Sequence, residues 1–222
     1  MGRKTGEKIK NLCIFALLGC LIFCAVVILP FLYGFYLTLT DWDGVSKVKN
    51  IVGVQNYISV FKDTAFWSSM GLTLKYVLLS VILVNAVAFL LAYALTNGIK
   101  GQKFFRAGFT GLSTDVLEAA SIDGATGFQK MKSIILPLMV PSFVICLFLT
   151  LSRAFMVYDV NLTLTGGEPY GSTRLVAMHV YEKAFTSRNY GVGQAEALIL
   201  FIIVACISGA QIYIGKKKEV EA

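Results

Sequence analysis

The chain has 222 residues, of which 56% are hydrophobic and only 15% are charged. Soluble domains average about a quarter charged residues, so this composition excludes an ordinary soluble domain. The four prolines and the abundance of apolar residues also exclude general disorder. None of the five cysteines forms a Cys-x-x-Cys pair and all lie in apolar runs, which excludes a disulfide scaffold and a zinc or redox motif.

The net charge of +7 could indicate a nucleic-acid partner, but the basic residues form short clusters beside apolar segments. This arrangement is typical of membrane proteins. Four stretches without charge are each long enough to cross a bilayer, and they lack the period-two alternation of barrel strands. The sequence therefore predicts an all-α integral membrane protein with about four transmembrane helices. We expect a single transmembrane domain over 1–222, with helices near residues 11–40, 76–99, 133–152 and 197–215.

The N-terminus also has features of a secretory signal, because a basic segment precedes an apolar run and Cys20 follows a short apolar box. The run continues for about twenty residues beyond Cys20, longer than the ~7–15 residues of a signal core. We therefore expect a retained transmembrane helix.

The distribution of Lys and Arg predicts the orientation. With a cytoplasmic N-terminus, 12 of the 20 basic residues lie in the inner segments 1–10, 100–132 and 216–218, and 8 lie in the longer outer segments 41–75 and 153–196. The positive-inside rule then places both termini in the cytoplasm.

The connector at 110–132 is the most informative segment. Asp115 and Glu118 have the spacing of a helix N-terminal capping box, and Gly124 or Gly127 would let the chain turn out of a short helix. A second helix is expected to start near Phe128 and to be kinked by two prolines. An ordinary interhelical loop is the alternative.

The spacing favours a specific interpretation. Glu118-Ala119-Ala120, Gly124, Ile134 and Leu136-Pro137 resemble the EAA motif of ABC-importer permeases at every fixed position. The resemblance implies that this cytoplasmic loop forms a coupling helix that docks on the ATPase subunit. The ATPase-coupling residues that it implies are Glu118, Ala119, Ala120, Asp123, Gly124, Ala125, Ile134, Leu136 and Pro137.

Flanking segments resemble the carbohydrate-uptake branch of that family. They include Tyr33-Gly34-Phe35-Tyr36, Val52-Gly53-Val54-Gln55-Asn56-Tyr57, Lys100 to Arg106 and Leu164 to Pro169. The resemblance implies a multi-pass sugar-transport permease of the type I importer core in the bacterial cytoplasmic membrane. The partners that it implies are an ABC ATPase subunit, a second permease subunit, an extracellular solute-binding protein, membrane lipid and a sugar or oligosaccharide. Nucleic acid is not among them, and no cofactor is expected on this chain.

One departure from the family pattern is large. Two helices normally separate the Phe-Phe-Arg turn from the EAA loop, but here Phe109 runs almost directly into Gly111-Leu112-Ser113. We therefore expect a truncated core that lacks one helical hairpin. A non-transporting membrane scaffold remains a rival for that reason, and glycerol phosphate remains an alternative substrate.

Other residues give weaker signals. No Walker lysine motif occurs, so ATP hydrolysis is expected on a separate partner chain, and no catalytic residue is assigned. His179 is the only histidine, which excludes a multi-histidine metal site, and we expect it to be a loop residue without a role. Asn85, Thr150 and Gln211 lie within apolar runs, where polar side chains often bond between helices. No substrate-binding residue is identified.

Overall fold

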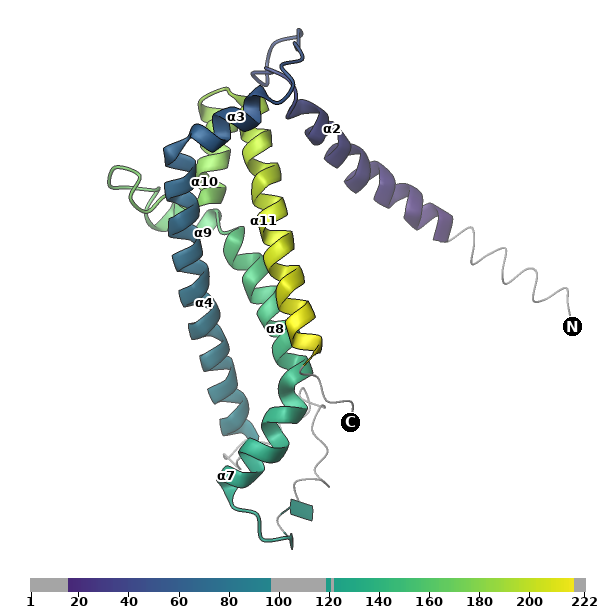
Figure 1. The fold of residues 1–222 in the computed structure, drawn as a ribbon, viewed down its shortest axis with the longest axis vertical. Helices are drawn as coiled ribbons and strands as arrows, with labels where there is room; N and C mark the ends of the chain where they lie inside the picture. The colour runs from purple at the N-terminus through teal and green to yellow at the C-terminus, as the bar shows by residue number, and fades with distance from the viewer. Residues whose placement is uncertain (1–15, 97–118, 121, 218–222) are drawn as a thin grey trace, which may run out of the picture. The chain divides into compact units, whose positions relative to one another are not determined.

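The computed structural model describes residues 16–96, 119–120 and 122–217, and these residues are almost entirely helical (Figure 1). Among them, extended pairing is limited to one antiparallel bridge between Thr40 and Ile51. The elements, in order, are η1 (Cys24–Ile28), α2 (Leu29–Leu37), α3 (Gln55–Lys62), α4 (Thr64–Thr96), α7 (Gly127–Lys130), η2 (Met131–Ile135), α8 (Leu136–Phe155), α9 (Asp159–Leu164), α10 (Val176–Tyr181), η3 (Glu182–Thr186) and α11 (Tyr190–Lys216). The predicted all-α fold is confirmed.

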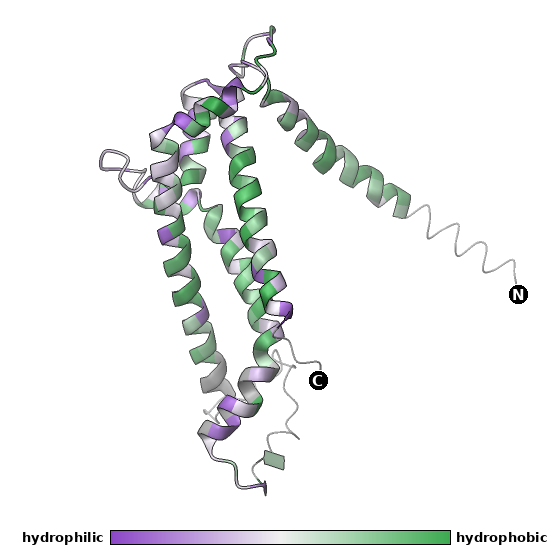
Figure 2. Ribbon diagram, viewed as in Figure 1, coloured by the Kyte–Doolittle hydropathy of each residue, from purple (hydrophilic) through white to green (hydrophobic). Residues whose placement is uncertain are grey.

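Three helical segments are long and apolar enough to cross a membrane: Ala16–Leu37, Thr64–Leu91 and Tyr190–Lys216. A shorter apolar helix, Met139–Phe155, overlaps the third predicted span. In Figure 2 the green of hydrophobic residues runs along these helices, and polar residues lie mainly near the helix ends and in the connections. Since a helix needs about 20 residues to cross the hydrocarbon, the described segments fit a membrane protein of about four helices.

Two helices begin earlier in the chain than the sequence predicted. Helix α4 begins at Thr64 rather than at residue 76, and α11 begins at Tyr190 rather than at residue 197. The predicted spans were uncharged runs that ended at charged side chains, but the charged residue Lys75 lies inside α4. The actual start of α4 is fixed by Asp63, whose Oδ1 accepts hydrogen bonds from the backbone N–H groups of Ala65 and Phe66 at 2.9 and 3.2 Å. Such a side-chain cap satisfies donors that the first turn leaves free.

The helix that leads into the third predicted span begins close to the predicted position. Thr126 and Gln129 form a reciprocal cap: Thr126 Oγ1 accepts a hydrogen bond from the Gln129 N–H, and Gln129 Oε1 accepts one from the Thr126 N–H. This capping box starts α7 at Gly127, one residue before the predicted start. The five-residue π-helix η2 then joins α7 to α8, which contains Pro141 in its interior.

The chain divides into two compact units. The first comprises residues 1–67 and 179–200, and the second comprises residues 68–178 and 201–222. In the first unit the buried apolar side chains include Leu37, Val60, Phe66, Ala184 and Ala195. In the second they include Met70, Val77, Phe155, Val176, Met178 and Val204. The expectation of one transmembrane domain over 1–222 stays a prediction.

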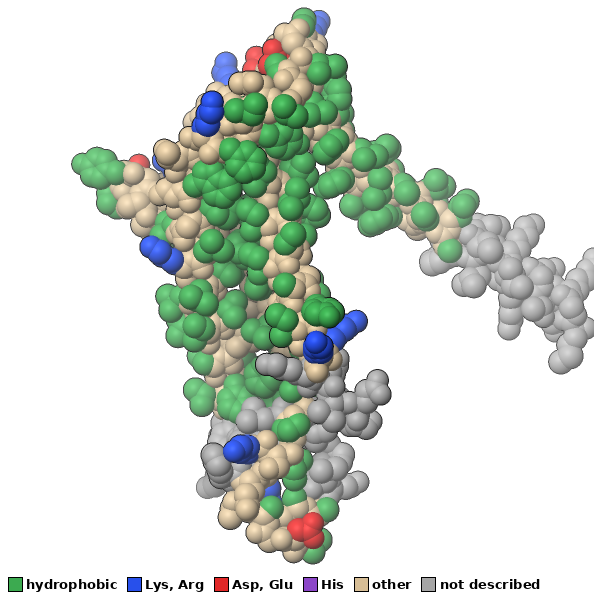
Figure 3. Space-filling model, viewed as in Figure 1, with side chains coloured by type: hydrophobic (Ala, Val, Ile, Leu, Met, Phe, Trp, Pro, Cys, Tyr) green, Lys and Arg blue, Asp and Glu red, His purple; other side chains and the backbone are tan. Residues whose placement is uncertain are grey.

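Large apolar side chains are exposed along the predicted spans. None of the first span's apolar window is buried, and 6% and 11% of the windows in α4 and α11 are buried. Hydrophobic side chains accordingly cover much of the visible helix surface in Figure 3. A soluble protein rarely exposes contiguous apolar patches of this size, whereas lipid or further helices would cover them in a membrane.

Of the three polar side chains expected to bond between helices, one does so. Gln211 Nε2 donates to the Val144 carbonyl at 3.1 Å and so links α11 to α8 within the second unit. The close approach depends on Gly215, where an added Cβ would lie 2.5 Å from a Val144 methyl group. Asn85 and Thr150 instead donate to the carbonyls of Val81 and Cys146 one turn back in their own helices.

Candidate functional site: a helical turn and a four-residue ionic cluster

The described part of the predicted coupling loop is a helical turn followed by a second helix. Glu118 lies outside the described residues. Ala119 is exposed and Ala120 is 8% exposed, and both are helical. The N–H of Asp123 donates to the Ala119 carbonyl and that of Ala125 to the Ala120 carbonyl, each at 3.0 Å.

Gly124 ends this turn in a left-handed conformation, with φ +77°. Few residues other than glycine adopt that conformation without strain. A Cβ at Gly124 would meet nothing within 4 Å, so the backbone angle rather than crowding requires glycine. The predicted chain turn at Gly124 is therefore present, and Gly127 instead begins α7.

The remaining predicted coupling residues lie at the start of the long helix. Ile134 is half-buried in η2, and Leu136 and Pro137 are the first two residues of α8. Asp123 is exposed in the turn and Ala125 is half-buried after it. The described segment is therefore two helical pieces joined by a left-handed turn, and its role in coupling stays a prediction.

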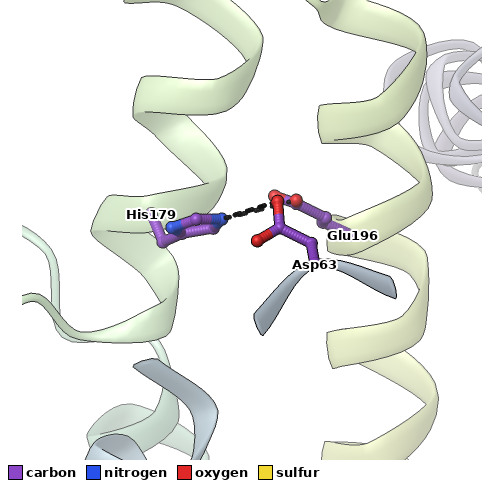
Figure 4. A group of neighbouring side chains, drawn as sticks. All are labelled: Asp63, His179 and Glu196. Atoms are coloured by element: carbon purple, nitrogen blue, oxygen red, sulfur yellow. Dashed lines mark ion pairs between the residues drawn. The ribbon is translucent and has the colours of Figure 1, made fainter. Parts of the chain in front are cut away.

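A second cluster of polar side chains lies in the first unit. Asp63, His179 and Glu196 point toward one another from three different elements (Figure 4). His179 Nε2 lies 3.4 Å from Glu196 Oε1 and 3.9 Å from Asp63 Oδ2. Lys183 Nζ donates to Asp63 Oδ2 at 2.6 Å. We call these four residues the four-residue ionic cluster.

Burial makes this cluster unusual. Glu196 has no exposed surface and His179 is 6% exposed, and neither Glu196 oxygen nor His179 Nε2 has a hydrogen-bond partner among the described residues. Burying a charge is unfavourable unless it is paired. The basic side chains of His179 and Lys183 are therefore the groups that can balance the two carboxylates.

Local sequence brings these side chains together. Asp63 caps α4, and His179 in α10 is four residues before Lys183, which places both on one helical face. Glu196 is on the second turn of α11, whose start packs tightly against the rest of the unit. A Cβ at Gly191 would lie 2.1 Å from the Thr40 carbonyl oxygen, and one at Gly193 would lie 2.7 Å from the Ala184 Cβ. The sequence Tyr190-Gly-Val-Gly therefore permits the approach that buries Glu196.

The charge of Asp63 is stabilised by its neighbours. Partial burial raises the pKa of its carboxyl, but the hydrogen bonds from Lys183 and from the Phe66 and Ala65 N–H groups outweigh this effect. The pKa of Asp63 therefore lies below its usual value of 3.8. Asp63 is anionic at neutral pH.

The same geometry permits a test for a metal site. The ligand atoms of Asp63, His179 and Glu196 all lie within 4.8 Å of one another, near the spacing that a divalent ion with bonds of about 2.0–2.2 Å would require. However, the Lys183 ammonium already holds Asp63 Oδ2 at 2.6 Å, so a metal ion would meet a fixed positive charge. We therefore interpret the cluster as an ion-pair network.

This cluster corrects the sequence prediction for His179, which is a buried residue of α10 and not a loop residue. Glu196 was missed because it lay at the edge of an apolar run and was counted with the outer loop. The four-residue spacing of His179 and Lys183 was a signal that could have placed both on one helix face. The acidic partners come from residues 63 and 196, and no spacing rule connects such distant positions.

Two acidic side chains organise the segment after α2. Asp43 Oδ1 accepts hydrogen bonds from the N–H groups of Ser46 and Val45 at 2.7 and 2.9 Å, which lower the pKa of Asp43 to about 2. The Asn50 side chain and N–H bind the Asp41 carboxylate and lower its pKa. Lys49 Nζ lies 4.3 Å from the Trp42 ring centre in a cation–π contact. These bonds give the polar segment a defined conformation.

Long apolar helices with large exposed apolar side chains define a helical membrane protein. The family model of the binding-protein-dependent transport system inner membrane component matches residues 10–220, and the chain belongs to this family. The predicted family is confirmed.

Two similar proteins cover most of the chain. A probable starch degradation products transport system permease protein, AmyD of Thermoanaerobacterium thermosulfurigenes, is 29% identical over 88% of this chain and 90% of its own length. The multiple sugar-binding transport system permease protein MsmF of Streptococcus mutans is 27% identical over 86% of this chain and 90% of its own length. Both names describe sugar-transport permeases.

A solved structure shares the fold. A chain of a bacterial ABC transporter involved in the import of the acidic polysaccharide alginate matches with a TM-score of 0.77 at 14% identity, and the match covers 97% of this chain and 99% of that chain. At this identity the likeness shows the fold alone.

The comparison with AmyD also bears on the predicted missing hairpin. The alignment runs over 265 positions, whereas the whole chain has 222 residues. The match covers 88% of this chain, about 195 residues, so about 70 of these positions have no residue of this chain opposite them. A hairpin of two helices of about 20 residues each, together with its connections, fits within a difference of that size.

Proposed function

We propose that this chain is a membrane-spanning permease subunit that imports a sugar or oligosaccharide. The observation that carries the proposal is that two relatives named for sugar transport cover 86% or more of the chain and 90% of their own lengths. The chain's role is to form part of the path through the membrane.

Movement would come from an ATPase on a separate chain, received at the coupling residues around Glu118. The turn between Ala120 and Gly124 supports this role, because small side chains let another backbone approach closely and the fixed φ at Gly124 gives the turn one shape. ATP-driven closure of the ATPase would then move the helix that starts at Gly127 as a rigid body.

The proposed orientation follows from the distribution of basic residues. Both termini and residues 100–132 face the cytoplasm of a bacterial cell, and residues 41–75 and 153–196 face outward. An external solute-binding protein would deliver the sugar to the outer segments. A second permease subunit would complete the path, since exposed apolar surface on the described helices is available for its helices.

Co-purification of the ATPase tests the coupling role. Gly124→Val forces a β-branched residue into φ +77°, while Gly127→Ala changes another glycine of the same segment, one with ordinary backbone angles. We expect Gly124→Val and Glu118→Lys to lose the ATPase and Gly127→Ala to retain it, with all three inserted in the membrane. Retention of the ATPase by both Gly124→Val and Glu118→Lys would contradict a docking role.

Uptake of labelled sugar by proteoliposomes that hold the permease pair, the ATPase and the binding protein tests transport itself. A version with a relative's hairpin inserted after Phe109 is the comparison. Because the natural chain lacks two helices that would help to enclose the path, we expect it to take up less sugar per ATPase-bound complex than the version with the inserted hairpin. Uptake of glycerol 3-phosphate and not of sugar would support the alternative substrate. ATPase-bound complexes without any uptake in either version would support the scaffold.

A further inference from the structure

Two adjoining pockets lie in the second unit, and they share Leu72 and Lys75 of α4. The first has a volume of about 330 Å³ and is mainly apolar, with Leu79 of α4 opposite Val160 and Leu164 of α9. The second has a volume of about 230 Å³ and is polar, with Ser68, Ser69, Ser172 and Arg174 in its wall. The two pockets share part of their wall, and we call them together the composite cavity, with one cationic end and one apolar end.

This polarity matches the depth of the residues along α4. The uncharged run 76–99 begins directly after Lys75, and about 20 residues at 1.5 Å each cross the ~30 Å of hydrocarbon. Lys75 therefore lies at the edge of the hydrocarbon, where lipid phosphates lie. The polar pocket extends from Lys75 toward Ser68, away from the apolar run, and the apolar pocket extends from Lys75 toward Leu79, into it.

The Lys75 ammonium is not paired with an acidic side chain among the described residues. Among the described residues, no carboxylate lies within ion-pair distance of Lys75 Nζ. Arg174 supplies a second cation to the same pocket. An anion that enters between them would gain charge-assisted contacts from two basic side chains.

The wall that carries Arg174 is held in one conformation by Asn161. This buried side chain donates from Nδ2 to the Thr173 carbonyl at 2.8 Å and accepts at Oδ1 from the Leu175 N–H at 3.0 Å. The next residue, Val176, donates its N–H to Thr73 Oγ1 of α4 at 2.8 Å. The residues on both sides of Arg174 are therefore tied to α9 and α4 before any ligand binds, which lowers the entropic cost of binding.

We propose that this composite cavity binds one anionic phospholipid, with its phosphate between Lys75 and Arg174 and an acyl chain along Leu79, Val160 and Leu164. A free phosphate would use the polar end alone, and a neutral sugar would gain little from either the two cations or the apolar wall. A phospholipid uses both ends, because its phosphate lies at the edge of the hydrocarbon and its acyl chains lie inside it. The proposal does not depend on the transported substrate.

Native mass spectrometry of the full-length protein with added phosphatidylglycerol tests the cationic end. Lys75→Ala is the variant, and Lys62→Ala, which removes an exposed lysine outside both pockets, is the matched control. We expect Lys75→Ala to weaken phosphatidylglycerol binding at least tenfold, Lys75→Arg to restore it, and Lys62→Ala to leave it unchanged. Equal binding by Lys75→Ala and the natural protein would overturn the proposal.

A second arm separates a lipid from a free phosphate. Val160→Trp fills the apolar end without touching either cation, so we expect it to weaken binding of long-chain phosphatidylglycerol severalfold. Glycerol phosphate, which has no acyl chain, should fail to displace the lipid at equal concentration. Displacement by glycerol phosphate together with unchanged lipid binding by Val160→Trp would show a phosphate site and refute the lipid assignment. Gel filtration of each variant confirms that the protein remains folded.

Discussion

His179 Nε2 lies 3.4 Å from Oε1 of Glu196, a carboxyl group without any exposed surface. His179 is on α10 and Glu196 is on α11, so the contact joins two helices of the first unit through a pair of ionisable groups. Lys183 and Asp63 form the second contact of the same network at 2.6 Å. The network therefore holds α10, α11 and the start of α4 in one arrangement.

The first prediction concerns this pair. Removing one partner of a buried ion pair leaves a buried charge unpaired and typically destabilises a protein by about 3–5 kcal/mol. We expect His179→Ala to lower the free energy of unfolding by a value in that range, measured by SDS titration in mixed micelles. The double variant His179→Ala/Glu196→Gln should recover part of the loss, because it also removes the stranded charge. If the stability losses of His179→Ala and Glu196→Gln, measured separately, sum to the loss of the double variant within about 0.5 kcal/mol, the two groups do not interact.

The second prediction concerns the glycines at the start of α11. Gly191→Ala would bring a Cβ to 2.1 Å from the Thr40 carbonyl oxygen, so the backbone of one segment must move. We expect a loss of about 1–3 kcal/mol, the usual effect of overpacking. The matched control is Gly209→Ala on the same helix, where a Cβ meets nothing within 4 Å.

At that control position alanine has a better helix propensity than glycine, by about 1 kcal/mol in soluble helices. Gly209→Ala should therefore be neutral or stabilising in the same SDS titration. Equal destabilisation by both variants would indicate a general intolerance of α11 to substitution and would contradict the packing argument.

The third prediction is a pH dependence in the segment after α2. The Asp43 pKa of about 2 lies below the value of 3.8 expected for a free carboxyl, so ionised Asp43 stabilises this turn above pH 3.8. The stabilisation is lost as the pH falls from 3.8 through 2. Trp42, whose Nε1 donates to the Ser46 carbonyl at 2.8 Å, reports on the turn.

In a Trp67→Phe background, which leaves Trp42 as the only tryptophan, its fluorescence should change over that pH window. Asp43→Asn should give the low-pH signal at every pH, while Asp159→Asn, at the start of α9, should leave the titration unchanged. A titration that survives Asp43→Asn would assign the transition to another group.

The fourth prediction concerns orientation. Val45 is 75% exposed and Ile122 is 87% exposed, and the proposed topology places them on opposite sides of the membrane. In a background without the five native cysteines, Val45→Cys should react with an impermeant maleimide added to intact cells. Ile122→Cys should react only after permeabilisation. Rapid labelling of Ile122→Cys in intact cells would reverse the topology.

Much of the fold could be predicted because long uncharged runs have few alternatives in a membrane. The starts of α4 and α11 could not be predicted in this way: Lys75 lies inside α4, and the true start of α4 depends on a side-chain cap by Asp63. The sequence predicted a turn at Gly124 or Gly127, and the structure places it at Gly124, whose φ of +77° favours glycine. The four-residue ionic cluster depends on residues far apart in sequence, and their approach follows from packing at Gly191 and Gly193.

The π-helix η2, Met131–Ile135, lies between the proposed coupling turn and α8. A π-turn holds one residue more than the α-helix from which it departs, and each α-helical residue rotates the chain by about 100°. The face that α7 presents is consequently out of angular phase with the face that α8 presents. If η2 relaxed to α-helical bonding while the chain length stayed the same, one end of the helix would have to rotate or slide by a residue. A force applied at the proposed coupling turn would thus be transmitted to α8 as a rotation about its axis.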